Sequence, residues 1–265
     1  MDRLSTSLLA LFNGWHVDAP QLVAQPQWER HFAAQGVHGT FVLDEPGRNR
    51  ILVLDEERAR KRYLPASTFT IASALIGLEE GAIRDQHEVF KWDGRPKPRR
   101  VWERDHTLDS GVRESVVWMF QEVARRLGRA RMKQWLAALE YGNRDAGGGV
   151  DNFWLQGELR VSAMEQVEFL RKLREGRLAV SARSARLVRN ALVHERTADY
   201  TIYAKTGTTG TIKEPVAWWV GWVERAARPA AYFAMNLSPA AKTPFGARFP
   251  IARAILAEAG VLPAP

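Results

Sequence analysis

Residues 63–78 read Tyr63-Leu64-Pro65-Ala66-Ser67-Thr68-Phe69-Thr70-Ile71-Ala72-Ser73-Ala74-Leu75-Ile76-Gly77-Leu78. Pro65 interrupts regular structure, and apolar residues then recur at helical spacing, which predicts a buried helix that begins near Ser67. Ser67 therefore lies in the first turn, where unpaired backbone N–H groups and the helix dipole favour negative charge. A serine there is either a nucleophile or an ordinary helix cap, and this stretch alone favours the cap.

Composition bounds the class of protein. The 265 residues allow one domain of the larger kind, and an apolar fraction of 46% is enough for a sizeable core. The absence of cysteine excludes disulfides, thiol nucleophiles and cysteine metal sites, but does not fix the compartment. The six histidines show no metal-ligand spacing, so we expect no metal site.

The net charge of +8 raises the question of a nucleic-acid partner. The arginines are scattered among acidic residues, as in residues 55–62, which favours an arginine-rich surface over a nucleic-acid site. No apolar run approaches the roughly 20 residues of a membrane span. Residues 1–24 resemble a short leader, with Leu22-Val23-Ala24 as a cleavage context, which predicts a periplasmic protein; a vestigial leader or a misassigned start is an equal alternative.

The order of patterns along the chain predicts the fold class. Residues 39–43 and 50–55 read as a β-hairpin, and the helix at Ser67 follows. Later segments read as helices at 115–127, 130–139, 162–175 and 181–193, as strands at 200–204, 216–223 and 230–236, and as a last helix at 250–259. We therefore expect an α/β (α+β) sandwich with an inserted helical lobe. The lobe would span residues 76–180, and the sheet would come from residues 25–75 and 181–265.

Four short motifs accompany the Ser67 helix, each weak when taken alone. They are Ser115-Val116-Val117 at a helix start, Tyr141-Gly142-Asn143 at a helix end, Phe153-Trp154-Leu155, and Lys205-Thr206-Gly207-Thr208 at a strand end. The plain interpretation of the last motif is a strand end with a turn.

Together and in this order, the motifs resemble those of the class D (oxacillinase-type) serine β-lactamases. Short segments between the motifs also match sequences of this family, namely residues 89–94, 102–105, 166–170 and 217–222. The resemblance extends from about Gly39 to the C-terminus. It implies a β-lactamase/transpeptidase-like fold, with a mixed, mainly antiparallel sheet flanked by helices. It also implies β-lactam antibiotics as partners, and either a monomer or a homodimer.

The resemblance implies roles for individual residues. Ser67 would attack the β-lactam carbonyl, and the backbone N–H groups of Ser67 and Thr208 would form the oxyanion hole. Ser115 would relay a proton beside Lys205. The residues expected to bind or enclose the substrate are Val117, Trp154, Leu155, Thr206, Gly207, Thr208 and Arg248, the last as a carboxylate fork.

Thr70 departs from the family pattern, in which a lysine stands three residues after the serine. In relatives that lysine is implied to be carbamylated by CO2 and to act as general base. A threonine hydroxyl is not basic near neutral pH and cannot carry a carbamate, so we expect no cofactor. Two origins of Thr70 stay open, a natural variant and a deliberate substitution, and the intact motifs elsewhere favour substitution.

Two hypotheses for function therefore stand side by side. The first is a serine β-lactamase whose deacylation is impaired by Thr70. The second is a penicillin-binding or sensor-type protein that stays acylated, although such sensors also keep the lysine and would be expected to follow membrane helices. Preference among penicillins, oxacillins, cephalosporins and carbapenems is not fixed by the sequence.

Overall fold

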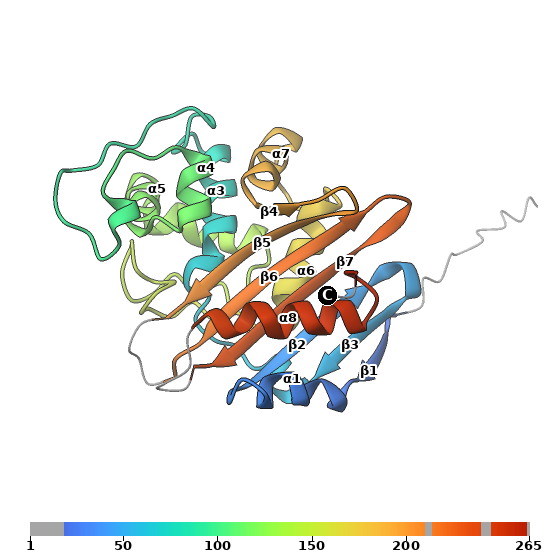
Figure 1. Ribbon diagram of the computed structural model, residues 1–265. Coiled ribbons are helices and arrows are strands. Elements are labelled where there is room, and N and C mark those ends of the chain that lie inside the picture. Colours follow the sequence, from blue (N-terminus) through green and yellow to red (C-terminus); the bar gives the residue numbers. More distant parts are fainter. Residues whose placement is uncertain (1–18, 210–213, 240–244, 264–265) are drawn as a thin grey trace, which may run out of the picture.

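The computed structural model describes residues 19–209, 214–239 and 245–263 (Figure 1). In this part of the chain, one mixed sheet has the strand order β1-β3-β2-β7-β6-β5-β4. The β1–β3 pair is parallel, and the other neighbouring pairs are antiparallel. The strands are β1 (Gln21–Ala24), β2 (His38–Glu45), β3 (Arg50–Leu54), β4 (Val193–Arg196), β5 (Tyr200–Thr208), β6 (Ala217–Arg225) and β7 (Arg228–Ser238).

Helices cover both faces of the sheet, as Figure 1 shows with α8 in front and α3 and α6 behind. The α-helices are α1 (Glu29–Ala33), α2 (Glu56–Arg60), α3 (Thr70–Glu79), α4 (Leu108–Glu114), α5 (Val117–Ala138), α6 (Ala163–Arg174), α7 (Ala182–Ala191) and α8 (Arg248–Glu258). A 3₁₀ turn over Ala66–Phe69 leads directly into α3, and another spans Arg100–Trp102. Among the described residues, no helix is both long enough and apolar enough to cross a membrane.

The two faces of β6 belong to two separate hydrophobic cores. Trp218 and Trp222 pack into the core that contains α3, α5 and α6. Trp219 points the other way, into the core beneath α1 and α8. Successive side chains of a strand alternate between faces, so a continuous apolar run fits a strand that is buried on both sides. β6 thus contributes side chains to both cores, one on each face of the sheet.

The structure confirms the predicted fold class, a mixed, mainly antiparallel sheet flanked by helices, and the predicted hairpin of β2 and β3. The two predicted helices at 115–127 and 130–139 both lie within α5, and they meet at Gly128, whose φ of +74° and ψ of 163° are not helical, so the predicted break between them is present. The sequence patterns missed β1, β4, α2 and α4, and the predicted helix at 181–193 ends earlier, at Ala191. The division into two lobes stays a prediction. The predicted helical lobe, residues 76–180, includes α6, and α6 packs against β7 and β2 of the sheet.

Candidate active site

Ser67 lies within the 3₁₀ turn that precedes α3 and is half-buried. The expected helix-cap alternative is not what the structure shows, since Pro65 occupies the cap position and no side chain makes a capping hydrogen bond. The Thr70 N–H donates to the Ser67 carbonyl. Residues three apart in a 3₁₀ turn eclipse one another, so Ser67 and Thr70 share one face. The serine is thus presented by a tight turn and keeps its hydroxyl free of a capping role.

One local and two long-range hydrogen bonds hold the turn around Ser67. Thr68 Oγ1 donates to the Pro65 carbonyl at 2.7 Å, and Gln166 Nε2 on α6 donates to Thr68 Oγ1 at 2.7 Å. The Ala66 N–H donates to the Trp154 carbonyl at 3.0 Å, and Ala66 itself has a left-handed φ of +49°. A non-glycine residue in that region costs energy, so the surrounding contacts must enforce it. The sequence analysis did not find these partners, because Gln166 is 98 residues from Thr68.

Strand β5 lies directly against this turn. A Cβ atom on Gly207 would stand 2.8 Å from the Pro65 carbonyl oxygen and 3.0 Å from the Thr68 nitrogen, so the close approach requires glycine. The side chain of Lys205, two residues earlier, points to the same face of the strand. The Lys205–Thr208 motif forms the end of a strand, as predicted: β5 ends at Thr208 and pairs with β6 up to that residue, so the strand is longer than the predicted 200–204.

Lys205 and Ser115 are brought together from opposite sides of the site. The Lys205 amine donates to Ser115 Oγ and, at 3.0 Å, to the Thr206 carbonyl. Ser115 is the residue after α4, with a left-handed φ of +55°, and it precedes α5 rather than starting it. Lys205 is only 4% exposed. Burial, and then the positive charges of Arg248 and Arg99, lower the pKa of Lys205 to about 7, so the amine is poised to accept a proton near neutral pH.

Arg248 is the first residue of α8 and lies beside the end of β5. Its guanidinium donates to Thr208 Oγ1 at 3.0 Å. Burial lowers the pKa of Arg248 to about 10, so the side chain keeps its charge at neutral pH. Thr206 and Thr208 are half-buried, and their side chains lie on the face of β5 opposite to that of Lys205. The structure thus places Arg248 and Thr208 together, and the expected binding of a carboxylate by them stays a prediction.

Trp154 packs directly against the residues that follow Ser67. It is 3% exposed, and its ring centroid lies 5.5 Å from that of Phe69. Leu155 is partly buried against the same core, and Val117, at the start of α5, is half-buried. All three residues are thus at least partly buried, and their role in enclosing the substrate stays a prediction.

The Tyr141-Gly142-Asn143 motif supports the loop that carries Trp154. Asn143 Nδ2 donates to the Glu158 carbonyl at 2.7 Å, and Asn143 Oδ1 accepts from the Arg160 N–H at 2.9 Å. Gly142 has a φ of +52°, and a Cβ atom there would lie 2.0 Å from the Arg160 carbonyl oxygen. The motif therefore supports the Trp154 loop through hydrogen bonds to the backbone of Glu158 and Arg160.

Thr70 begins α3 and is 5% exposed. Its hydroxyl offers no amine to which CO2 could add, so the residues present do not fit a carbamate. One helical turn further on, Ser73 is fully buried, and its hydroxyl has no hydrogen-bond partner among the described residues. Nor do the described residues include a group of three or more histidine, aspartate or glutamate side chains able to hold a metal ion.

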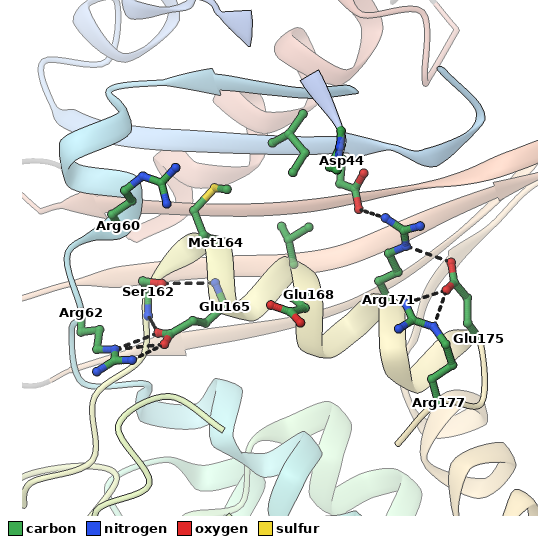
Figure 2. Close-up of a pocket in the computed structure, with 13 residues that line it drawn as sticks. Asp44, Arg60, Arg62, Ser162, Met164, Glu165, Glu168, Arg171, Glu175 and Arg177 are labelled. Carbon is green, nitrogen blue, oxygen red and sulfur yellow. Dashed lines mark hydrogen bonds and ion pairs between the residues drawn. The ribbon is translucent and has the colours of Figure 1, made fainter. Parts of the chain in front are cut away.

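A hollow of about 990 Å³ lies elsewhere, beside α6 (Figure 2). Figure 2 shows an ion-pair network at one end of it, where Arg171 reaches both Asp44, at 3.2 Å, and Glu175, at 3.1 Å. None of the site residues predicted from the sequence lines this hollow. It is therefore separate from the cluster around Ser67, and its facing charges are largely paired with one another.

Comparison with known proteins agrees with this arrangement. The penicillin-binding protein transpeptidase domain matches residues 39–257. The chain is 44% identical to β-lactamase OXA-10 of Pseudomonas aeruginosa over 222 residues, 83% of each protein. It is 40% identical to β-lactamase OXA-48 of Klebsiella pneumoniae over 256 residues, 97% of this chain and 96% of that protein. The crystal structure of FUS-1 (OXA-85), a class D β-lactamase from Fusobacterium nucleatum subsp. polymorphum, superposes with a TM-score of 0.86 at 32% identity, covering 90% of this chain and 99% of that one. The chain belongs to the class D β-lactamases, within the transpeptidase family of penicillin-binding proteins.

Proposed function

We propose that this chain reacts with β-lactams through Ser67 to form an acyl-enzyme, and that it releases the acyl group slowly because Thr70 supplies no general base. The observation that carries the proposal is the hydrogen bond between half-buried Ser115 and buried Lys205, which is on the strand that lies against the Ser67 turn. It offers a route for the proton of acylation that does not pass through residue 70. The hydrolase class follows from the family; the impairment is the proposal.

Acylation would proceed by attack of Ser67 Oγ on the β-lactam carbonyl carbon. The hydroxyl proton would pass by way of Ser115 to the neutral Lys205 amine. As the ring C–N bond breaks, the leaving nitrogen would take a proton from Ser115, which Lys205 then reprotonates. The pKa of Lys205, lowered to about 7, supports this role, because an effective general base titrates near the working pH.

Charge that develops on the carbonyl oxygen would be stabilised by the backbone N–H groups of Ser67 and Thr208. The contact of Gly207 with Pro65 and Thr68 supports this pairing, since it brings β5 against the turn that carries Ser67. Fixed backbone donors of this kind are worth about 10²–10³-fold in rate. Neither donor depends on residue 70.

Arg248, with the hydroxyls of Thr206 and Thr208, would bind the carboxylate of the substrate. Two observations support this role. The charged guanidinium of Arg248 donates to Thr208 Oγ1, and it is partly buried, which strengthens a charge-assisted hydrogen bond to a carboxylate. Val117, Trp154 and Leu155 would shield the acyl bond from bulk water.

Deacylation requires a base that activates water against the acyl-enzyme. A threonine hydroxyl cannot serve, and general base catalysis contributes typically about 10²–10⁴-fold. We therefore expect acylation to be slow and deacylation to be slower. The second candidate function, a penicillin-binding protein that stays acylated, shares every step up to the acyl-enzyme and differs only in the lifetime of that species. A periplasmic location after loss of a leader, and a monomeric or dimeric state, stay predictions.

The test is intact-mass measurement after mixing the protein with excess benzylpenicillin, sampled from seconds to hours, with Ser67→Ala as the control. The proposal predicts a one-to-one adduct that forms slowly, persists for hours and is lost in Ser67→Ala. Rapid turnover of the penicillin without accumulation of an adduct would contradict the proposed impairment. No adduct on a folded protein would contradict the Lys205–Ser115 route. The lifetime of the adduct separates the two candidate functions.

A further inference from the structure

The carbonyl of Glu114 receives two side-chain donors from one segment of the chain. Arg99 Nη1 donates to it at 3.0 Å, and Trp102 Nε1 donates to it at 2.9 Å. The carbonyl of Trp102 in turn accepts from Trp118 Nε1 at 3.0 Å, which fastens the segment to α5. Residues 99–102 therefore form a clamp on the end of α4.

The clamped carbonyl belongs to the peptide that joins Glu114 to Ser115. A peptide group is planar, so fixing its carbonyl oxygen also fixes the nitrogen of Ser115. Ser115 has the left-handed φ of +55°, which a non-glycine residue adopts only under constraint. Its hydroxyl accepts from Lys205 in this conformation. The clamp thus acts on the residue that contacts Lys205.

Arg99 also brings a charge to the site. Its guanidinium lies over the ring of Trp102, 5.5 Å from the ring centroid, which is within the limit of about 6 Å for a cation–π contact. Three charged groups act on Lys205: Arg248 from α8, Arg99 from the clamp and Glu114 from α4. The charge of Lys205 also acts on His194 of β4, whose pKa is lowered chiefly by burial. The two arginines favour the neutral amine, and Glu114 opposes them. Arg99 is the exposed member of the two arginines, and so the simpler to replace.

We propose that Arg99 is a positioning residue for proton transfer, which holds Ser115 against Lys205 through the Glu114 carbonyl and whose positive charge acts on the Lys205 amine. The inference rests on the proposed acylation route. It separates two effects of one side chain, a hydrogen bond that places Ser115 and a charge that keeps Lys205 able to accept a proton. Each effect has its own variant.

Four variants divide these effects. Arg99→Gln removes the charge, and Arg99→Lys keeps it. Trp102→Phe removes the second donor to the Glu114 carbonyl while leaving a ring beneath Arg99. Arg100→Gln is the matched control, because Arg100 is the next residue, is exposed and has a side chain that makes no hydrogen bond or ion pair with the described residues.

The experiment measures the rate of Ser67 acylation by benzylpenicillin from pH 6 to 9.5, by intact mass. In the Arg99→Gln variant we expect the midpoint of the rising limb to move upward by about 0.5 unit, since a like charge near Lys205 is lost. The rate at pH 7 should then fall about two- to fivefold. Arg99→Lys should return the midpoint toward that of the parent, Trp102→Phe should lower the rate without moving the midpoint, and Arg100→Gln should match the parent.

Equal midpoints for Arg99→Gln, Arg100→Gln and the parent would overturn the inference. Failure of the proposed acylation route is a different result, the absence of an adduct in the parent itself. A second measurement covers that case: the titration of Lys205, followed by NMR of its side chain and assigned with Lys205→Met. An upward shift in Arg99→Gln, absent in Arg100→Gln, supports the inference without any reaction, and no shift refutes it.

Discussion

At the scale of the single residue, Thr70 decides how the site can work. It shares a face with Ser67 and is nearly buried, so a longer side chain there would point toward the nucleophile. We expect Thr70→Lys to raise the turnover of benzylpenicillin by about 10²–10⁴-fold, because it supplies an amine that can act as the missing base. The measurement is the steady-state kcat in bicarbonate buffer.

Thr70→Met is the matched control for that substitution. Methionine has a similar length and no basic atom, so any gain that comes from filling space alone would appear in both variants. If Thr70→Lys turned penicillin over no faster than Thr70→Met, the account of Thr70 as the cause of impairment would be wrong.

Residue-scale prediction succeeded where the signal was local. Ser67 and Thr70 are three residues apart, a spacing that predicts a shared helix face. The structure places them in one continuous helical segment, which is consistent with that prediction. Arg99 was not found, because its partner is a backbone carbonyl 15 residues away and nothing in residues 95–100 distinguishes one basic residue from the next. The left-handed Ala66 was likewise hidden, since its conformation is imposed by contacts from distant parts of the chain, such as the Trp154 carbonyl.

At the scale of the element, the loop that carries Trp154 depends on Gly142. A Cβ atom at that position would meet the Arg160 carbonyl oxygen at 2.0 Å, and backbone cannot move aside as a flexible side chain can. We expect Gly142→Ala to lower the free energy of unfolding by at least about 2 kcal/mol, from backbone strain and the steric clash together. The measurement is the midpoint of urea denaturation.

Gly176→Ala gives the comparison for strain alone. Gly176 also has a positive φ, +69°, but a Cβ atom there would find nothing within 4 Å. Its cost should be about 1 kcal/mol, the penalty of the left-handed conformation without a clash. Equal losses in the two variants would show that the contact with Arg160 adds nothing.

Element-scale prediction followed the strength of the local pattern. The long apolar run of β6 and the turn residues between β2 and β3 gave unambiguous strands. Helix α4 was missed because only Leu108, Gly111 and Val112 of its residues are buried, which leaves too short an apolar stripe to read. β4 was absorbed into the preceding helix, since its four residues alternate between half-buried and exposed and carry no apolar run.

At the scale of the whole molecule, the buried amine of Lys205 costs stability. Its pKa is about 7 in the folded protein and near its ordinary value of 10.5 when unfolded, so between these pH values the unfolded chain binds more protons. Stability from this group therefore rises with pH across that window, and below pH 7 the whole cost is present. We expect Lys205→Met to stabilise the fold by about 1–3 kcal/mol at pH 7 and by less at pH 9.5, measured by urea denaturation.

Lys133→Met is the control for removing one positive charge, because Lys133 is an exposed residue of α5. It should change stability little, and equally at both pH values. A gain in Lys205→Met that stayed constant with pH would contradict the assignment of the cost to protonation of Lys205. We thus expect Lys205, a residue of the candidate site, to lower the free energy of unfolding of the protein.

The parallel strand β1 has a consequence for how the molecule behaves among copies of itself. β1 covers the outer edge of β3, with Gln21 to Ala24 in register with Arg50 to Val53. The cleavage context expected at Leu22–Ala24 lies inside this strand. Removal of the chain through Ala24 would leave β3 with unpaired N–H and C=O groups along a largely apolar edge, which is a template for strand addition by a neighbouring molecule. β1 thus replaces β3 as the outermost strand, and it presents a shorter and less buried edge. We expect a chain shortened through Ala24 to expose the more apolar edge of β3 to pairing with a second molecule.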